Sequence, residues 1–412
     1  MIKYPRKLDI IFKKLNNLNI NAVIVGGYVR DSLLGKESKD IDIELYGIST
    51  LDKVEEVLKE FGNINQVGKS FGVCKLFFED LDLDFSLPRL ETKISSGHKG
   101  FEVSTYSHLN FETASSRRDF TINAIGFDVE KKIILDPHHG VEDLKSSSLH
   151  FVNKTTFAED PLRILRGIQF CSRYNLSMSR GLFELCQEMI HKNMLHELPK
   201  ERIFDEIKKL LLESQKPSLG LILFKKLGAF SYFSELYSLS EDAWHKTLLA
   251  LDEMVQHKIK DEKTNIILML SLLCYFLSED KKISFLEKLS HERKILSSVL
   301  VLTQYRLNKK MSDSEIYRLA TKTNLQHTVL IHLAIYPEKQ ESFTKIQNRA
   351  KELGVLHKKI KALVQGRDLI HLGVPPSKSF SQILASAYEA QMDGVFKTHG
   401  EAILWLKKEL LA

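Results

Sequence analysis

The spacing of apolar and polar positions changes along the chain. Residues 4–17 have the three-to-four spacing of an amphipathic helix, and the β-branched run "AVIVGG" from Ala22 then stops at two glycines. The next segments predict a strand, a capped helix and a hairpin of two strands: "DIDIELYG" from Asp40, "STLDKVEEVLKEFG" from Ser49 and "VCKLFFEDLDLDFSL" from Val73. The N-terminal part is therefore predicted to be a small mixed α/β domain.

From about Phe157 the pattern becomes helical. The segments with amphipathic spacing are "DPLRILRGIQFCSRYNL", "GLFELCQEMIHKNM" and "KERIFDEIKKLLLES", and strand signals almost vanish after them. These patterns predict an α+β protein: a head with a mixed sheet at residues 1–145, a helical neck at 146–220, and a helical body and tail at 221–412.

Composition and charge narrow the class of protein without identifying it. A chain of 412 residues with 43% hydrophobic and 27% charged residues is typical of a folded globular protein, and its net charge of +6 is compatible with a polyanionic partner. The four cysteines show no zinc-site spacing, and the N-terminus does not resemble an export signal, so we expect a cytoplasmic protein. The apolar run "NIILMLSLLCYFLSED" is too short to span a membrane, and no membrane partner is expected.

The stretch "VIVGGYVRDSLLGKESKDIDIELYG" combines a glycine turn with paired carboxylates. Gly26 and Gly27 lie where a strand turns into a helix, which lets backbone N–H groups approach phosphate, and Arg30 adds a guanidinium. Asp40 and Asp42 project from the same face of a strand, where their repulsion is relieved by a divalent cation such as Mg²⁺. Either feature alone is also common in proteins without this chemistry. Together they predict a metal held against a triphosphate, and hence nucleotidyl transfer.

The order of motifs resembles a known family. GGxVRD followed by KDIDI is similar to the signature of the class II nucleotidyltransferases of the polymerase-beta superfamily, which contains bacterial CCA-adding enzymes and poly(A) polymerases. "RRDFTINAI" from Arg117 resembles the family's second motif, which implies that Arg118, Asp119 and Asn123 hold the ribose and triphosphate. "EDPLRILRGIQF" resembles its nucleotide-selecting helix, and "LPKERIFDEIKKLL" resembles the neck motif that supports this helix.

Asp160 and Arg163 are the candidates for reading the incoming base. An aspartate and an arginine three positions apart on a helix share a face, where they offer an acceptor beside a donor. The resemblance implies that these positions select C and A without a nucleic-acid template, and Arg166 is assigned to the same nucleotide-binding group. The alternative is an ordinary helix cap with a surface ion pair.

Two further features extend the site. Asp84 is a candidate third carboxylate and Arg89 a candidate orienting group, although a solvated edge strand also explains the acidic alternation there. Residues Leu90–Ser116, rich in Gly, Ser and His, are expected to form a mobile loop above the site. In the family a full-length loop goes with complete CCA addition, and this segment does not look truncated.

The helical remainder has a partial likeness to an HD phosphohydrolase domain, which long family members often carry. His245 resembles a first metal ligand, but Cys274, Tyr275 and Phe276 stand where a His-Asp pair is expected. The helical scaffold is therefore predicted to persist without its metal site.

The resemblance implies a tRNA nucleotidyltransferase that builds or repairs the 3'-terminal CCA from CTP and ATP. Its expected partners are CTP, ATP and the acceptor arm and 3' end of tRNA, recognised by shape and phosphates. A poly(A) polymerase of the same class is the first alternative. An inactive RNA-binding protein is the second.

Overall fold

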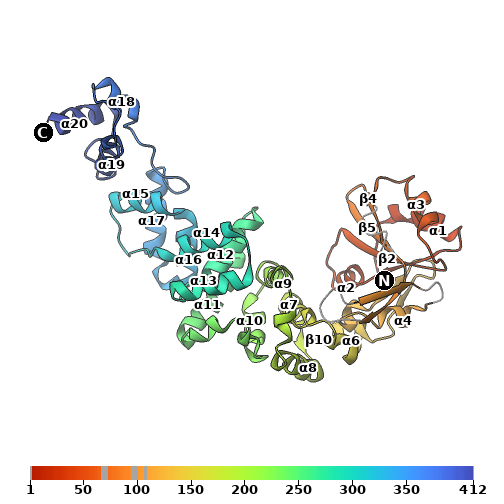
Figure 1. Ribbon diagram of the computed structural model, residues 1–412. Coiled ribbons are helices and arrows are strands. Elements are labelled where there is room, and N and C mark those ends of the chain that lie inside the picture. The colour runs from red at the N-terminus through yellow and green to blue at the C-terminus, as the bar shows by residue number, and fades with distance from the viewer. Residues whose placement is uncertain (1, 66–72, 94–100, 106–108, 412) are drawn as a thin grey trace. The chain divides into compact units, whose positions relative to one another are not determined.

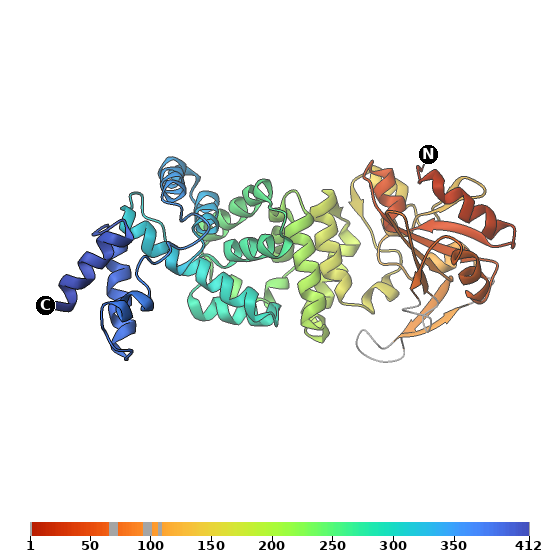
Figure 2. The same ribbon diagram turned by 90° about the horizontal axis from the view of Figure 1, so that it is seen from above.

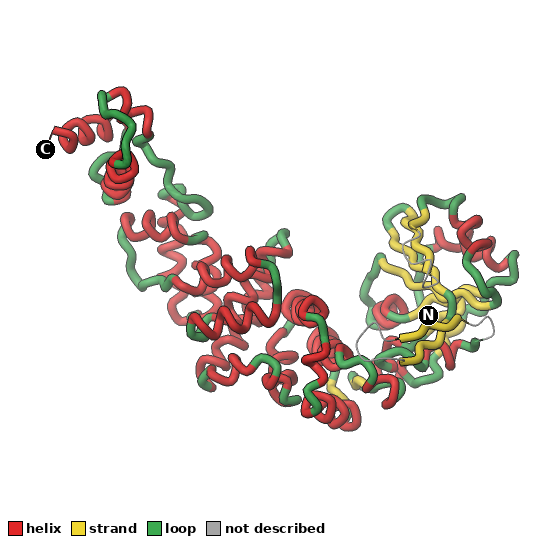
Figure 3. Tube along the Cα trace, viewed as in Figure 1, coloured by secondary structure: helices red, strands yellow, loops and turns green. Residues whose placement is uncertain are grey.

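The computed structural model describes residues 2–65, 73–93, 101–105 and 109–411. These residues form two compact units, Met1–Ser234 and Glu235–Ala412. All named strands lie in the first unit, and the second unit is helical in its described part (Figure 3). The predicted α+β class is confirmed. The division into head, neck and body stays a prediction, with the head and neck ranges both inside the first unit.

A seven-stranded mixed sheet forms the core of the N-terminal part of the first unit (Figure 1). Its strand order is β3-β4-β5-β2-β1-β8-β9; β2 and β5 are parallel, and the other neighbours are antiparallel. The strands are β1 (Asn21–Val25), β2 (Asp40–Tyr46), β3 (Ile64–Asn65), β4 (Val73–Phe78), β5 (Leu81–Ser86), β8 (Gly126–Asp128) and β9 (Ile133–Leu135). The predicted strands and hairpin are therefore present, and the crossover from β2 to β5 places the two acidic segments side by side.

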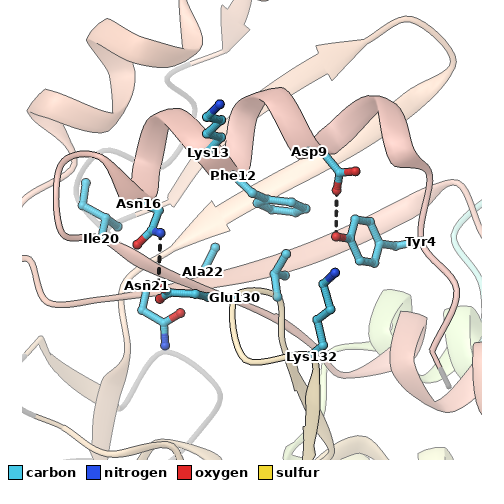
Figure 4. Close-up of a pocket in the computed structure, with 11 residues that line it drawn as sticks. Tyr4, Asp9, Phe12, Lys13, Asn16, Ile20, Asn21, Ala22, Glu130 and Lys132 are labelled. Carbon is cyan, nitrogen blue, oxygen red and sulfur yellow. Dashed lines mark hydrogen bonds between the residues drawn. The ribbon is translucent and has the colours of Figure 1, made fainter.

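Helix α1 (Asp9–Asn16) packs on one face of this sheet. Ile11, Phe12 and Leu15 are buried at helical spacing, and Phe12 lies beside Ala22 of β1 (Figure 4). A pocket of about 340 Å³ opens between α1 and the turn after β8. None of the predicted site residues lines this pocket. Its lining consists of Tyr4, Asp9, Phe12, Lys13, Asn16, Ile20, Asn21, Ala22, Val129, Glu130 and Lys132.

A second group of helices continues from the sheet within the first unit. Helix α7 (Leu162–Tyr174) packs against α9 (Lys200–Glu213) and α10 (Pro217–Lys226), and Figure 2 shows these helices in a second view. The buried ring of Phe120 meets Phe157 and Phe170 edge-on, at centroid distances of 5.7 and 5.6 Å. Phe157 belongs to α6 (Lys154–Ala158) and Phe170 to α7. This aromatic cluster fixes the segment from Arg117 to Asn123 against the helices.

Two predicted elements differ from the structure. The helix expected over residues 4–17 is shorter, because α1 begins at Asp9 after a 3-10 turn at Arg6–Leu8. The expectation of a mobile loop over Leu90–Ser116 is wrong in part. Strands β6 (Arg89–Lys93) and β7 (Phe101–Thr105) pair antiparallel, and α4 (Phe111–Ser115) follows. The backbones of these strands pair from Arg89 opposite Thr105 to Lys93 opposite Phe101, whereas residues 94–100 and 106–108 lie outside the described residues.

The second unit consists of helices in its described part. They are α11 (Glu241–Met254), α12 (Glu262–Cys274), α13 (Glu279–Leu289), α14 (Arg293–Gln304), α15 (Asp313–Lys322), α16 (Leu325–Ile335), α17 (Gln340–Glu352), α18 (Gly366–His371), α19 (Ser379–Met392) and α20 (His399–Leu411). Helices α18 to α20 enclose a small apolar cluster of their own around Leu369, Phe396 and Leu406. The structure contains no helix that is both long and apolar enough to cross a membrane, within the residues described.

Gly140→Ala is expected to destabilise the first unit. Gly140 begins α5 (Gly140–Lys145), and a Cβ there would lie 2.2 Å from the carbonyl oxygen of Thr121, a backbone atom that cannot rotate away. Forced overpacking of this kind costs about 1–3 kcal/mol. In scanning calorimetry the unfolding midpoint of the first unit should fall by several degrees. Gly181→Ala is the matched control, because the nearest atom to its Cβ is 3.9 Å away in a helix, so its midpoint should stay or rise. Equal midpoints in the two variants would contradict the close packing at Gly140.

Candidate active site

Strand β2 carries acidic residues on one face and apolar residues on the other. Ile41, Ile43 and Leu45 are buried, while Asp40 and Asp42 are exposed on the opposite face. The predicted common face of the two aspartates is therefore observed. Parallel pairing with β5 adds further carboxylates, because Asp82 lies opposite Asp40 and Asp84 opposite Asp42.

Asp84 lies next to Asp42, as a third carboxylate would. Its Oδ2 accepts a hydrogen bond from Lys75 Nζ at 2.6 Å, so part of its charge is neutralised by β4. Arg89 begins β6. It does not line the hollow of about 610 Å³ that is lined by Asp40, Asp42, Asp82 and Asp84. Its role as an orienting group stays a prediction.

The charge around Asp42 is poised to attract a cation. Although Asp42 is exposed on the sheet face, protein atoms close around its carboxylate displace water, which raises its pKa; Asp84 and Glu44 raise it further, while Arg118 and Lys75 oppose the shift. Among the described residues, no three His, Cys, Asp or Glu side chains converge to form a complete metal cage. Two carboxylates fit Mg²⁺ nonetheless, since this ion is commonly bound by one or two carboxylates with substrate phosphates as further ligands.

The glycine turn lies directly against this acidic face. Gly26 has φ +69°, and a Cβ there would lie 2.8 Å from Arg118 Nη1 and 3.7 Å from Asp42 Oδ2. Glycine is thus favoured by the left-handed backbone conformation, and a side chain there would push the end of Arg118 aside. Gly27 follows as the first residue of α2 (Gly27–Leu33). The turn, the guanidinium and the carboxylate form one cluster.

Glu44 holds the two arginines beside the acidic face and was missed by sequence reasoning. Its Oε1 accepts hydrogen bonds from Arg118 Nη2 at 3.0 Å and Arg117 Nη2 at 3.2 Å, and its Oε2 accepts one from Tyr46 Oη at 2.9 Å. Burial would raise its pKa, but Arg118 and Arg117 together hold the pKa below its ordinary value. The signal was present in the strand, because Glu44 continues the alternation of Asp40 and Asp42.

Arg30, Asn123, Asp119 and Arg166 form a continuous chain of hydrogen bonds, which is buried except at the partly exposed Arg166. Arg30 Nη1 donates to Asn123 Oδ1 at 2.5 Å, and Asn123 Nδ2 donates to Asp119 Oδ1 at 3.0 Å. Arg166 Nε donates to Asp119 Oδ2 at 2.6 Å. The chain joins α2 to the 3-10 turn η3 (Thr121–Asn123) and to α7. Burial would raise the pKa of Asp119, but Arg166 and Asn123 hold it below its ordinary value.

Arg30 has an evident positioning role in this chain. Its side chain is 6% exposed; Nη2 donates to Tyr174 Oη at 2.7 Å and Nε to Asp31 Oδ1 at 2.9 Å, so each guanidinium nitrogen has a protein partner. The guanidinium also stacks over the Tyr174 ring at 4.6 Å. The predicted contact of Arg30 with phosphate stays a prediction.

The helix that was expected to carry Asp160 begins after it. Helix α7 starts at Leu162, and Asp160 Oδ1 accepts a hydrogen bond from the Leu162 N–H at 3.1 Å. Pro161 explains the difference, because proline favours a helix start and cannot donate to a preceding turn. Asp160 Oδ2 faces Arg202 Nη2 of α9 at 3.5 Å. The prediction that both members of the pair lie on the helix is therefore wrong for Asp160.

Arg163, on the first turn of α7, is held by backbone carbonyl groups. Its Nη1 donates to Thr156 O at 3.1 Å and its Nη2 to Arg117 O at 2.8 Å. These bonds fix the guanidinium between the helix and the segment that carries Arg118 and Asp119. Sequence reasoning placed Arg202 in the supporting motif but did not assign it a contact with Asp160.

The positions that resemble an HD site differ in their exposure to solvent. His245 is exposed on α11, whereas Cys274 and Tyr275 are buried. Tyr275 Oη lies 3.2 Å from Nε2 of His332, whose pKa is lowered to about 4 by burial. His332 is therefore neutral at ordinary pH and serves the packing of this unit.

Three family profiles match the chain. Residues 22–150 match the "Poly A polymerase head domain", residues 175–253 match "Probable RNA and SrmB- binding site of polymerase A", and residues 258–406 match domain 2 of tRNA nucleotidyltransferases.

Curated relatives are similar over much of the chain. The A-adding tRNA nucleotidyltransferase of Aquifex aeolicus is 29% identical over 85% of this chain and 43% of its own length. The Multifunctional CCA protein of Mannheimia succiniciproducens is 32% identical over 63% of both chains. The chain thus spans less than two thirds of the length of either relative.

Solved structures share the fold. The CCA-adding enzyme of Bacillus stearothermophilus in complex with CTP superposes with a TM-score of 0.76 at 22% identity, covering 99% of this chain and 98% of that one. The Thermotoga maritima CCA-adding enzyme complexed with tRNA gives 0.69 at 19% identity, covering 99% and 97%.

Glu44→Gln is expected to destabilise the first unit by about 3–5 kcal/mol, because removing one member of a buried ion pair leaves two guanidinium groups without their carboxylate. Chemical denaturation followed by circular dichroism measures the loss. Glu60→Gln is the control: it breaks an exposed pair with Lys14 and should change stability by less than about 1 kcal/mol. Similar small effects in both variants would show that Glu44 does not anchor the arginines.

Proposed function

Because the chain belongs to the family of nucleotidyltransferases that contains the bacterial CCA-adding enzymes and poly(A) polymerases, we propose that it adds or repairs the 3'-terminal CCA of tRNA. In this proposal the enzyme uses CTP and ATP without a nucleic-acid template and releases pyrophosphate. One observation carries it: Asp40 and Asp42 share a sheet face against the Gly26 turn and Arg118. In that cluster the aspartates offer negative charge for a metal. Next to them, Arg118 offers positive charge and the Gly26 turn offers backbone without a side chain, both suited to a triphosphate.

The carboxylates of Asp40 and Asp42 would hold the divalent metal that this family uses, and we propose Mg²⁺. Bound there, the metal would lower the pKa of the RNA 3' hydroxyl and neutralise charge on the phosphates. Gly26 and Gly27 leave room for the triphosphate, and Arg118 offers it a guanidinium. Glu44 keeps that guanidinium in place before the substrate arrives, which lowers the cost of organising the site.

Asp160 and Arg163 are proposed to read the incoming base. Both are partly exposed at the start of α7. One oxygen of Asp160 caps α7 and the other forms only a long contact of 3.5 Å with Arg202, while the guanidinium of Arg163 has five N–H donors, of which two are engaged in the bonds described above. The remaining groups suit the exocyclic amines and ring acceptors of C and A. The buried chain from Arg30 to Arg166 supports the pair by tying α7 to the glycine turn.

Two alternatives differ in product rather than in chemistry. Poly(A) synthesis is not favoured, because the curated relatives above are tRNA nucleotidyltransferases or CCA proteins. Addition of the terminal A alone is the stronger alternative, because the Aquifex aeolicus relative bears that activity in its name and matches 85% of this chain. We propose the cytoplasm as the location, since tRNA is the proposed substrate.

A single assay separates these products. The protein is incubated with labelled CTP or ATP and with tRNAs that lack A, CA or CCA. Extension of all three to CCA supports the proposal. Extension only of the tRNA ending in CC identifies an A-adding enzyme, and long A tracts identify a poly(A) polymerase. No incorporation with any substrate would leave an inactive RNA-binding protein.

Asp40→Asn and Asp42→Asn should each reduce incorporation of both nucleotides by roughly a thousandfold or more, because each removes a metal ligand. The raised pKa of Asp42 means that its ionised form is disfavoured by the fold at neutral pH, so Asp42→Asn should unfold no earlier than wild type without divalent ions. Mg²⁺ should raise the unfolding midpoint of wild type but not of this variant.

Glu130→Gln, on the turn after β8, is the matched control for those measurements and should keep both activity and the Mg²⁺ response. Near-normal turnover in Asp40→Asn or Asp42→Asn would place the metal elsewhere.

Asp160→Asn and Arg163→Gln should weaken base selection more than triphosphate binding. Asn preserves an oxygen that caps α7, although it removes the charge that faces Arg202. Each lost bond to a charged group should lower the preference for CTP and ATP over UTP and GTP by roughly ten- to a hundredfold, measured as ratios of kcat/KM. The double variant should lose less than the sum, because both residues contact one base. Asp205→Asn, on the exposed face of α9, is the control. Unchanged ratios in both single variants would place selection elsewhere.

A further inference from the structure

A hollow of about 610 Å³ lies beside the carboxylates, over β5 and β4. The register of the three strands places its side chains in rows, with Phe77 opposite Asp82 and Lys75 opposite Asp84, continuing to Asp40 and Asp42. Residues directly opposite in such pairs project from the same face of a sheet. The hollow is therefore lined by Asp40, Asp42, Asp82 and Asp84 together with Lys75 and Phe77.

Phe77 is unusually exposed for an aromatic side chain. It is 60% exposed, and no other phenylalanine whose side chain the structure describes is as exposed. A partner that covered this ring would gain the free energy of burying its apolar area. A flat ring at the edge of a polar hollow is suited to stacking with a nucleobase, because every base presents a π-face.

The strand order assigns opposite sides of β2 to the two substrates. On one side, β1 leads into the Gly26 turn, where the triphosphate is proposed to bind; on the other side lie β5 and β4. In an in-line displacement the attacking oxygen and the leaving pyrophosphate are on opposite sides of the phosphorus. With the leaving pyrophosphate toward the Gly26 turn, as proposed, the attacking 3' hydroxyl approaches from the side of β5 and β4, where the hollow lies.

We propose that this hollow receives the 3'-terminal nucleotides of the acceptor RNA, with the ring of Phe77 stacked on a base. This inference rests on the proposed function. Lys75 supplies the cation at the same edge; its side chain is 51% exposed and holds Asp84 at 2.6 Å, from where it can also face a backbone phosphate. The occupant is an RNA end rather than a second nucleotide, because the triphosphate has its own basic partner, Arg118, across β2.

Phe77→Ala should raise KM for tRNA by roughly five- to a hundredfold, the range for losing one base–aromatic stack, with KM for CTP and ATP unchanged. Phe77→Trp should restore the wild-type value, since it keeps a flat ring. Ile133→Ala is the matched control: Ile133 is 46% exposed on β9, at the opposite edge of the sheet, and its loss should leave both KM values unchanged.

A binding measurement without turnover makes the test independent of catalysis. A tRNA with 2-aminopurine at its 3'-terminal position is titrated with each variant in the absence of CTP and ATP. Wild type and Phe77→Trp should quench the fluorescence by stacking, whereas Phe77→Ala should not. Equal quenching and equal KM for tRNA in Phe77→Ala and Ile133→Ala would overturn the inference, and so would a rise in KM for nucleotide instead of tRNA. Absence of incorporation by wild type would refute the proposed function itself, a result distinct from either.

Discussion

The ion pairs between Glu44 and the two arginines are the interaction on which the site depends. A buried carboxylate on β2 draws Arg118 and Arg117 from a distant segment to the same sheet face that carries Asp40 and Asp42. Without it, a row of carboxylates would face water alone, and the guanidinium of Arg118 would have no reason to lie against the Gly26 turn. The site thus places fixed charges of opposite sign next to each other before any substrate binds, which is the arrangement that electrostatic preorganisation requires.

A second set of polar contacts links helix α2, after the glycine turn, to helix α7. The buried chain from Arg30 through Asn123 and Asp119 to Arg166 joins the helix after the glycine turn to the helix that follows Asp160. Each member has a partner of complementary charge or hydrogen-bonding type, so removing one leaves buried groups unsatisfied. The phenyl ring of Phe120 packs against Phe170 of α7 and Phe157 of α6 from the apolar side. The position of α7, where Asp160 and Arg163 are proposed to read the base, is therefore tied to the position of the glycine turn.

Local patterns were sufficient for part of this site and insufficient for the rest. The period of two in β2 predicted the common face of Asp40 and Asp42, and a glycine pair after a β-branched run predicted the turn. The partners of Arg30 and Arg163 could not be predicted, because Asn123, Tyr174 and Thr156 reach them only through tertiary packing. Pro161 is the sequence signal for the start of α7. The predicted helix was too long because its periodicity was extended past this proline to Asp160. The paired strands β6 and β7 were missed because short strands with few apolar residues resemble a loop until their partner is known.

The parallel pairing of β2 with β5 has a consequence for how this protein can misfold. Side chains alternate with a period of two, so a slip of one residue would turn Ile41, Ile43 and Leu45 toward water and Asp40, Asp42 and Glu44 into the apolar layer. Such a chain would bury unpaired charge and expose an apolar face, which leads to aggregation rather than to a dissolved protein with an altered site. Molecules that remain in solution therefore share one arrangement of carboxylates. If the proposed activity holds, differences in specific activity between preparations would measure the fraction of chains that reached this register, not a spread of partly active forms.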